Sequence, residues 1–197
     1  MATIADRKTE FEVNPLFVQR WSPRAYTGEV IPDEVLFGAL EAARWAPSAV
    51  NAQPWRFIYS KRDSKSWATF LELLLPGNRR WADKASALVV IVSRRSFIKN
   101  GETVPSRSHS FDAGAAWQNL ALQATASGWH AHAIGGFDAE KARIALQIPE
   151  NFIAEVVVAV GKRGDKSVLP PDLQEREAPN TRQPLKEIAL EGVFQAA

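Results

Sequence analysis

The chain has 197 residues, of which 46% are hydrophobic and 23% charged, as expected for a soluble domain with a sizeable core. A formal net charge of +2 without a long basic run gives no indication of nucleic-acid binding. The absence of cysteine excludes disulfides, thiolate metal sites and a cysteine nucleophile. The apolar run 87–92 is far shorter than a membrane span, and the charged N-terminus does not resemble a signal peptide, so we expect a cytoplasmic protein without a membrane segment.

The first half of the chain alternates helix and strand patterns. Residues 32–46 are a predicted helix, because a proline and two acidic residues suit its first turn and apolar residues follow at helical spacing. The next proline disfavours helical geometry at residue 46 and ends this helix. Residues 55–59 are a predicted strand and residues 66–75 a helix that Pro76-Gly77 ends. Residues 87–92 are apolar on both faces, which indicates a strand inside a sheet.

The second half continues this mixed order. Asp112 is placed to cap a long helix with one apolar stripe, which Gly128 ends. A strand over residues 129–134, a helix over 139–146 and a strand over 153–160 follow. The order predicts an α+β sandwich of a sheet and its helices.

Prolines interrupt regular structure beyond Gly164, at Pro170, Pro171, Pro179 and Pro184. No linker divides the middle of the chain, so we expect one domain over residues 1–197. Its last part, the C-terminal arm of about residues 165–197, has too little core to fold alone. We therefore expect the arm to wrap another surface, such as that of a partner subunit.

Arg20, Ser22 and Arg24 occupy alternate positions in Arg20-Trp21-Ser22-Pro23-Arg24. If the backbone is extended, their three side chains point to one side. Two guanidinium groups and a hydroxyl on one face suit an anion such as phosphate, through charge-assisted hydrogen bonds. A solvated arginine face paired with carboxylates is the alternative that this segment leaves open.

The segment Pro47-Ser48-Ala49-Val50-Asn51-Ala52-Gln53-Pro54-Trp55 joins a predicted helix to a predicted strand. Its amide side chains both donate and accept hydrogen bonds, as the alternating carbonyl and N–H edge of a flavin requires. A turn with local capping bonds from serine and asparagine is the alternative.

These segments resemble the cofactor motifs of the nitroreductase family. The segment Pro47–Trp55 matches the family signature Pro-Ser-x-x-Asn-x-Gln-Pro-Trp without a gap. Gly135-Gly136-Phe137-Asp138 resembles the family's Gly-Phe-Asp segment. Arg182 resembles the arginine that contacts the phosphate in the family's C-terminal tail. The resemblance extends from about residue 15 to about residue 190 in the family's order. It implies a three-layer sandwich, with a mixed, mostly antiparallel sheet flanked by helices and an extended C-terminal arm.

The resemblance also implies that FMN lies at the interface of a homodimer. Arg20, Ser22 and Arg182 would hold its phosphate and ribityl chain, and Arg24 would lie toward the pyrimidine edge. The family often has a basic residue where this chain has Asn180.

Other residues would surround the flavin ring. Pro47, Ser48 and Asn51 would approach it from the other subunit, while Gly135 and Gly136 would present backbone near N5. The cofactor-binding residues that the resemblance implies are Arg20, Trp21, Ser22, Arg24, Pro47, Ser48, Asn51, Gln53, Asn78, Gly135, Gly136 and Arg182.

The implied activity is that of an FMN-dependent oxidoreductase that uses NAD(P)H to reduce flat, electron-poor small molecules such as nitroaromatics and quinones. Hydride transfer through flavin N5 would follow ping-pong kinetics and needs no side-chain nucleophile, so no catalytic side chain is predicted. Two alternatives stay open: a non-catalytic FMN carrier or sensor, and a scaffold whose arginines bind acidic protein surfaces. The sequence carries no signal for NADH over NADPH.

The three histidines do not define a site. His130 and His132 alternate on a predicted strand, but no third ligand has suitable spacing, so no metal site is predicted. His109, in the predicted loop 106–110, could line a substrate pocket or be solvated.

Overall fold

A computed structural model describes residues 3–194. Its helices are α1 (Pro15–Gln19), α2 (Asp33–Arg44), α3 (Trp67–Leu73), α4 (Pro76–Ala82), α5 (His109–Ala126), α6 (Ala139–Ala145), α7 (Pro171–Gln174) and α8 (Leu185–Ile188). Its strands are β1 (Trp55–Lys61), β2 (Ala87–Arg94), β3 (Ser96–Lys99), β4 (Glu102–Pro105), β5 (His130–Ile134) and β6 (Phe152–Gly161). The short 3-10 helices are η1 (Ile4–Asp6), η2 (Ala49–Asn51) and η3 (Lys166–Val168).

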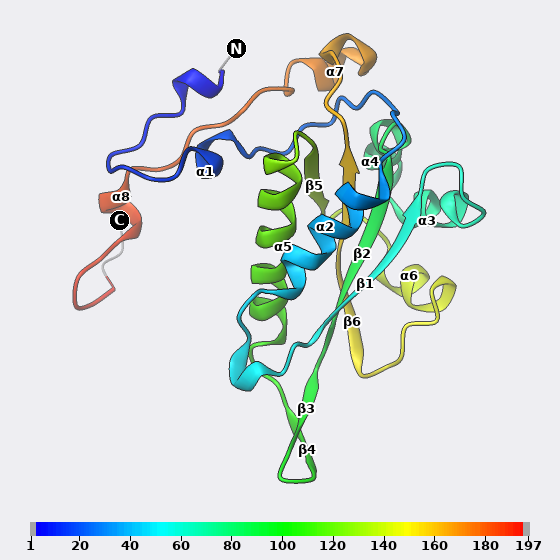
Figure 1. The fold of residues 1–197 in the computed structure, drawn as a ribbon, viewed down its shortest axis with the longest axis vertical. Coiled ribbons are helices and arrows are strands. Elements are labelled where there is room, and N and C mark those ends of the chain that lie inside the picture. Colours follow the sequence, from blue (N-terminus) through cyan, green and yellow to red (C-terminus); the bar gives the residue numbers. More distant parts are fainter. Residues whose placement is uncertain (1–2, 195–197) are drawn as a thin grey trace.

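One sheet forms the centre of the molecule, with the strand order β1-β2-β6-β5. All its described pairings are antiparallel, and β3 and β4 form a separate hairpin at one end (Figure 1). This arrangement confirms the predicted α+β fold and its largely antiparallel sheet. A parallel pairing, which a mixed sheet would add, is not seen within residues 3–194.

Helices cover both faces of the sheet, which gives the three predicted layers. Alternate residues of β2 point to opposite faces, and both sets are buried. Val89 and Ile91 pack with α2 and α5, whereas Leu88 and Val90 pack with α3, α4 and α6. The continuous apolar run of β2 is therefore explained by burial on both sides.

Several elements were not predicted from the sequence. They are α1, the β3–β4 hairpin, α4 and the short helices α7 and α8 of the C-terminal arm. Pro76 does follow the end of α3, but it also occupies the first position of α4, where its missing N–H costs no helical hydrogen bond. The proline that indicated a helix end therefore also begins the next helix.

The predicted start of α5 is wrong. Ser108 is the N-cap residue, so Asp112 lies within the helix, and its side chain is only 4% exposed. His109 is the first residue of α5 rather than part of a loop, and its Nδ1 lies 2.7 Å from the Ser93 Oγ on β2. The predicted end is correct, because Gly128 has a φ of 74°, which favours glycine.

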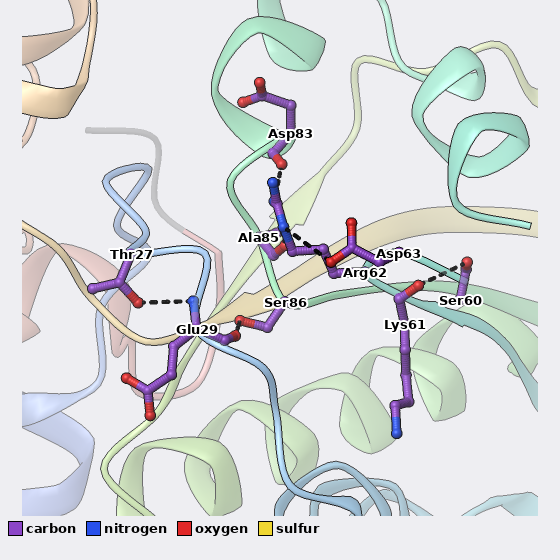
Figure 2. A network of polar contacts seen from close by, with 9 residues as sticks. All are labelled: Thr27, Glu29, Ser60, Lys61, Arg62, Asp63, Asp83, Ala85 and Ser86. Carbon is purple, nitrogen blue, oxygen red and sulfur yellow. Dashed lines mark hydrogen bonds and ion pairs between the residues drawn. The ribbon is translucent and has the colours of Figure 1, made fainter. Parts of the chain in front are cut away.

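A polar network attaches the end of α4 to the sheet (Figure 2). Arg62, which directly follows β1, donates to the carbonyl oxygens of Asp83 and Ala85, the latter at 3.3 Å. Ser86 donates to the Glu29 carbonyl oxygen in the same network. Carbonyl groups past the end of a helix lack helical partners, so these bonds fix α4 in place.

The C-terminal arm has two parts with different environments. Leu169, Leu173 and Glu177 are buried against the body of the same chain. Residues 181–194 are exposed, and they extend away from the sheet beside the N-terminal segment (Figure 1). The Leu185 N–H donates to the Glu10 carboxylate at 2.7 Å, which joins the two segments.

In the described part of the chain, no helix has the length and hydropathy required to cross a membrane.

Candidate functional site

The first predicted motif forms one polar face, as its alternation indicated. Arg20 follows α1 in extended backbone, and its Nη1 donates to the Ser22 Oγ at 3.2 Å. Arg20, Ser22 and Arg24 are half-buried, whereas the interleaved Trp21 and Pro23 are buried. The two guanidinium groups and the hydroxyl therefore lie on the same side of the segment.

Trp21 does not join this face. Its side chain is only 6% exposed and lies under the Arg163 guanidinium, whose central carbon is 5.9 Å from the ring centroid. The structure therefore places Trp21 apart from the other predicted cofactor residues, as a packing residue that holds the motif onto the body.

The backbone of Arg24 is held by the C-terminal arm. Its N–H donates to both carboxylate oxygens of Glu177, at 2.8 and 3.0 Å, and the Ala25 N–H donates to the same carboxylate at 2.9 Å. The Arg24 guanidinium lies 5.9 Å from the Trp81 ring centroid, within the range of a cation–π contact. Burial lowers the pKa of Arg24, as does the nearby Arg176, while Glu177 opposes the change.

Asn78 and Gly136 meet beside this face. The Asn78 Nδ2 donates to the Gly136 carbonyl oxygen at 3.0 Å, and its Oδ1 accepts from the Trp81 Nε1 at 3.4 Å. A Cβ on Gly136 would lie 2.4 Å from the Asn78 Nδ2, so glycine is required for this contact. Gly135 has open space where a Cβ would stand, so its backbone is accessible to a ligand.

His132 completes this group from β5. Its ring centroid is 4.7 Å from that of Trp81, and its Nδ1 donates to the Pro23 carbonyl oxygen at 2.9 Å, which leaves Nε2 unprotonated in the neutral ring. Burial lowers the pKa of His132 to about 4, and the charges of Arg24 and Arg20 act in the same direction. This histidine is therefore neutral at pH 7.

Arg182 and Arg7 lie near Arg20, close enough for their charges to affect its pKa. Burial lowers the pKa of Arg20, and the neighbouring charges of Arg7 and Arg182 lower it further. Arg7 and Arg182 line a pocket of about 410 Å³ between the N-terminal segment and the C-terminal arm. Three guanidinium groups thus gather at one end of the polar face.

The second predicted motif has a strained backbone. Val50, Asn51 and Gln53 all have positive φ, at 49°, 53° and 45°, a conformation that is rare for a β-branched residue such as valine. The Gln53 N–H donates to the Ser48 Oγ at 3.0 Å, which closes the turn. Such strain persists only where the surroundings hold it, and it is concentrated at functional sites.

Asp112 holds this strained segment to α5. Its Oδ2 accepts from the Ala49 N–H at 3.3 Å and from the Ser108 Oγ at 3.1 Å. On the other side of the motif, the Arg94 N–H donates to the Pro54 carbonyl oxygen at 2.9 Å. Both ends of the segment are therefore attached to regular elements.

The structure does not bring the two motifs together within one chain. The Asp112 contact places the Pro47–Gln53 segment at the start of α5, while α1, which Arg20 directly follows, lies toward the other end of that helix (Figure 1). An α-helix of 18 residues is about 27 Å long. A single chain therefore presents Arg20, Ser22, Arg24, Asn78, Gly136 and Arg182 as one group, and Pro47, Ser48, Asn51 and Gln53 as another.

Several residues of this region could not have been found from sequence. Trp81, His132 and Glu177 come together through the fold, from α4, β5 and the C-terminal arm. For His132 the only signal in the sequence is its alternation with His130, which does not predict a metal site because a third ligand is missing. Within residues 3–194, no group of three or more His, Cys, Asp or Glu side chains is arranged to hold a metal ion.

The architecture defines an α+β protein with a three-layer nitroreductase-type fold. The profile described as "Nitroreductase family" matches residues 17–80 and 65–162, which together span more than half of the chain. The chain therefore belongs to the nitroreductase family, as the motifs predicted.

Two sequence relatives cover most of this chain, and the description of the first agrees with the assignment. A protein of Archaeoglobus fulgidus assigned as an NADH dehydrogenase/NAD(P)H nitroreductase is 32% identical over 151 residues, covering 75% of this chain and 83% of that protein. An uncharacterised 15.4 kDa protein of Mycolicibacterium smegmatis is 31% identical over 145 residues, covering 70% and 95%.

Solved structures share the whole fold. A crystal structure described as an oxidoreductase containing FMN is 49% identical, with a TM-score of 0.95 and complete coverage of both chains. A protein of Desulfovibrio desulfuricans, assigned as a nitroreductase and solved in complex with FMN, is 26% identical with a TM-score of 0.72, covering 93% of this chain and 100% of that one. These similarities confirm the predicted class of enzyme, an oxidoreductase of the nitroreductase type.

Proposed function

We propose that the protein is an FMN-dependent oxidoreductase that uses NAD(P)H to reduce small electron acceptors. The observation that carries this proposal is the group of Arg20, Ser22 and Arg24 on one face, in a chain 49% identical to an FMN-containing oxidoreductase. The FMN cofactor and NAD(P)H as co-substrate agree with what is described for the relatives. The cytoplasmic location and the lack of a nucleic-acid partner remain predictions from the sequence.

The phosphate and ribityl chain of FMN would bind Arg20, Ser22 and Arg182. Within residues 3–194, neither Arg20 nor Arg182 forms an ion pair with a carboxylate, so both remain available to an anion. Charge-assisted, bidentate contacts are the usual way in which arginine holds phosphate. Arginines without ion pairs would also suit a scaffold that binds acidic proteins, so this charge alone does not distinguish the two. Membership of the nitroreductase family favours the oxidoreductase.

The flavin ring would lie along Arg24, Asn78 and the backbone of Gly135 and Gly136. Arg24 is suited to the pyrimidine edge because Glu177 holds its backbone in place while its guanidinium stays cationic. Gly135 leaves room for a close approach. A fixed positive charge near that edge would stabilise negative charge that develops during reduction.

The site would be completed by a second copy of the chain, with Pro47, Ser48, Asn51 and Gln53 supplied by the partner. The two motifs lie toward opposite ends of α5, which supports a site shared between two copies of the chain (Figure 1). Apolar side chains also surround the exposed motif: Val50 is 74% exposed and Phe111 82% exposed, on either side of the Ala49–Asp112 contact. Exposed apolar groups of this kind mark an interaction surface.

The C-terminal arm would contribute to the same homodimer. Its described end carries large apolar side chains that are exposed in the single chain: Leu185, Ile188, Leu190, Val193 and Phe194. We propose that residues 1–197 form one domain and that the part of the arm after residue 180 wraps the partner. Burying these side chains would stabilise the dimer by roughly 25 cal/mol for each Å² of apolar surface removed from water.

FMN, when bound, would supply the chemistry for accepting hydride from NAD(P)H and passing electrons to an acceptor. The protein binds and orients the reactants, and no side chain is required as a nucleophile. Flat, electron-poor acceptors such as nitroaromatics and quinones suit an open site beside a planar ring. Use of one site by both substrates in turn would give ping-pong kinetics.

The visible spectrum of the purified protein, before and after anaerobic addition of NADH or NADPH, tests the proposal. We expect a flavin band that bleaches when the nicotinamide is added and returns when a quinone follows. Bound flavin that neither nucleotide reduces would instead indicate a carrier or sensor. A colourless protein that does not take up added FMN would overturn the proposal.

A further inference from the structure

Arg7 contacts the first motif, although it belongs to a different segment of the chain, near the N-terminus. It follows η1, and its Nη1 donates to the carbonyl oxygens of Arg20, at 2.9 Å, and Val18. These bonds place a third guanidinium group directly beside the backbone that carries Arg20. No sequence motif includes Arg7.

Arg7, Arg20 and Arg182 form a concentrated positive charge, the arginine cluster. Burial lowers the pKa of Arg7, and the charge of Arg182 lowers it further, as expected for like charges held close together. Within residues 3–194, none of the three forms an ion pair. Like charges without counter-charges destabilise the folded chain unless an anion binds among them.

Two carboxylates of the N-terminal segment, those of Asp6 and Glu10, have other partners. Asp6 lines the same pocket as Arg7, but its Oδ2 accepts from the Thr3 N–H at 2.6 Å and from the Thr3 Oγ1 at 2.9 Å. Glu10 accepts from the Leu185 N–H at 2.7 Å. Both carboxylates therefore accept hydrogen bonds from groups outside the arginine cluster, and the cluster keeps its charge.

We propose that Arg7 is a specificity-determining residue that binds the phosphate group of the flavin and so selects FMN over riboflavin. This inference rests on the proposed function. A guanidinium group has five N–H donors, and the recorded bonds of Arg7 use only Nη1, so Nη2 and Nε can contact a phosphate in the pocket that Arg7 lines. A phosphate monoester carries nearly two negative charges at pH 7, which suits three cations better than one.

The alternative is that Arg7 only holds the backbone of residues 18–20 in place. That structural role would affect any ligand of the first motif, whether or not it carries phosphate. Riboflavin has the same ring and ribityl chain as FMN but no phosphate. A comparison of the two flavins therefore separates a phosphate contact from a structural contact.

The test is the affinity of full-length, flavin-free protein for FMN and for riboflavin, measured by quenching of flavin fluorescence. In Arg7→Gln we expect FMN affinity to fall about ten-fold or more, as for loss of one charge-assisted hydrogen bond, while riboflavin affinity changes less than about two-fold. Arg7→Lys, which keeps the charge, should restore part of the FMN preference. Arg143→Gln is the matched control, because Arg143 is an exposed arginine paired with Glu140 on α6.

An equal loss of affinity for both flavins in Arg7→Gln would show a purely structural role and overturn the inference, as would an unchanged preference for FMN. Neither result would affect the proposed function, provided that the unchanged protein binds FMN. If the unchanged protein binds neither flavin, the proposed function itself fails.

Discussion

The carboxylate of Glu177 binds the backbone N–H of Arg24 across 153 residues of chain, with contacts of 2.8 and 3.0 Å. The Ala25 N–H donates to the same group, and the Glu177 side chain is only 8% exposed. A charged side chain in the C-terminal arm thus holds the segment that carries the candidate flavin contacts. The first part of the arm therefore packs against its own chain and helps to hold that chain's fold together.

We expect Glu177→Ala to destabilise the protein by about 1–3 kcal/mol, because buried N–H groups of Arg24 and Ala25 lose their acceptor. For a chain of this size, each kcal/mol corresponds to a decrease in melting temperature of about 2–4 °C. Glu177→Gln keeps one carbonyl acceptor and should lose less. Thermal unfolding of both variants measures this, and equal melting temperatures for all three proteins would contradict the role assigned to Glu177.

Arg20→Ala should weaken FMN binding by about 1.5–3 kcal/mol, the range for a hydrogen bond to a charged group. This corresponds to roughly a 10- to 100-fold increase in the dissociation constant, which a flavin fluorescence titration measures. Arg143→Ala removes an exposed, paired arginine and serves as the control. Unchanged FMN affinity in Arg20→Ala would remove this residue from the candidate site.

Gly135 and Gly136 are neighbours with different surroundings, so alanine at each makes a matched pair. In Gly136→Ala the new Cβ would displace Asn78, which would lose its bond to the Gly136 carbonyl, at a cost of about 1–3 kcal/mol. Gly135→Ala points into open space and should change stability by less than about 0.5 kcal/mol. Urea unfolding of the flavin-free variants distinguishes them. Equal stability would show that Asn78 moves aside without cost.

Asp112→Ala should loosen the strained Pro47–Gln53 segment, because the Ala49 N–H and the Ser108 Oγ lose a buried acceptor. We expect a loss of about 1–3 kcal/mol in stability. Asp112→Asn retains an acceptor oxygen and should be milder. Limited proteolysis provides a local readout, since cleavage near Val50 should increase in the alanine variant and remain slow in the asparagine variant. Identical cleavage in both would contradict the positioning role.

Stability should fall in mild acid because of the half-buried histidines His130 and His132. Burial lowers the pKa values of His130 and His132 to about 4 from an ordinary value of 6.5. Between these values the unfolded chain binds more protons than the folded chain, so stability rises with pH in that window. The contribution is fully present above about pH 6.5 and is lost as the pH falls toward 4.

The variant His132→Gln isolates one of these contributions. The difference in melting temperature between the variant and the unchanged protein should depend on pH between 4 and 6.5 and be constant above it. Carboxylates that titrate in the same range affect both proteins equally and cancel in the difference. A difference that does not vary with pH would show that His132 is not the group responsible.

The amino-acid sequence alone determined the fold class, most of the elements and the family. Local signals sufficed because they act over a few residues: the apolar run of β2 requires burial on both faces, the alternation of Arg20, Ser22 and Arg24 defines a polar face, and Gly128 ends α5. The predicted start of α5 was wrong because serine and aspartate both suit the N-cap position of a helix. Only the contact of Asp112 with Ala49 shows that Asp112 lies inside the helix and that Ser108 is the N-cap residue.

The tertiary structure decided which distant residues meet. The contacts of Glu177 with Arg24, of Asn78 with Gly136 and of Arg7 with the backbone of Arg20 depend on how the C-terminal arm, α4 and the N-terminal segment pack against the sheet. No local pattern encodes these pairs, because packing over the whole chain sets their geometry. The same packing places the two predicted cofactor motifs toward opposite ends of α5, which is the physical reason for proposing that two copies of the chain build one site.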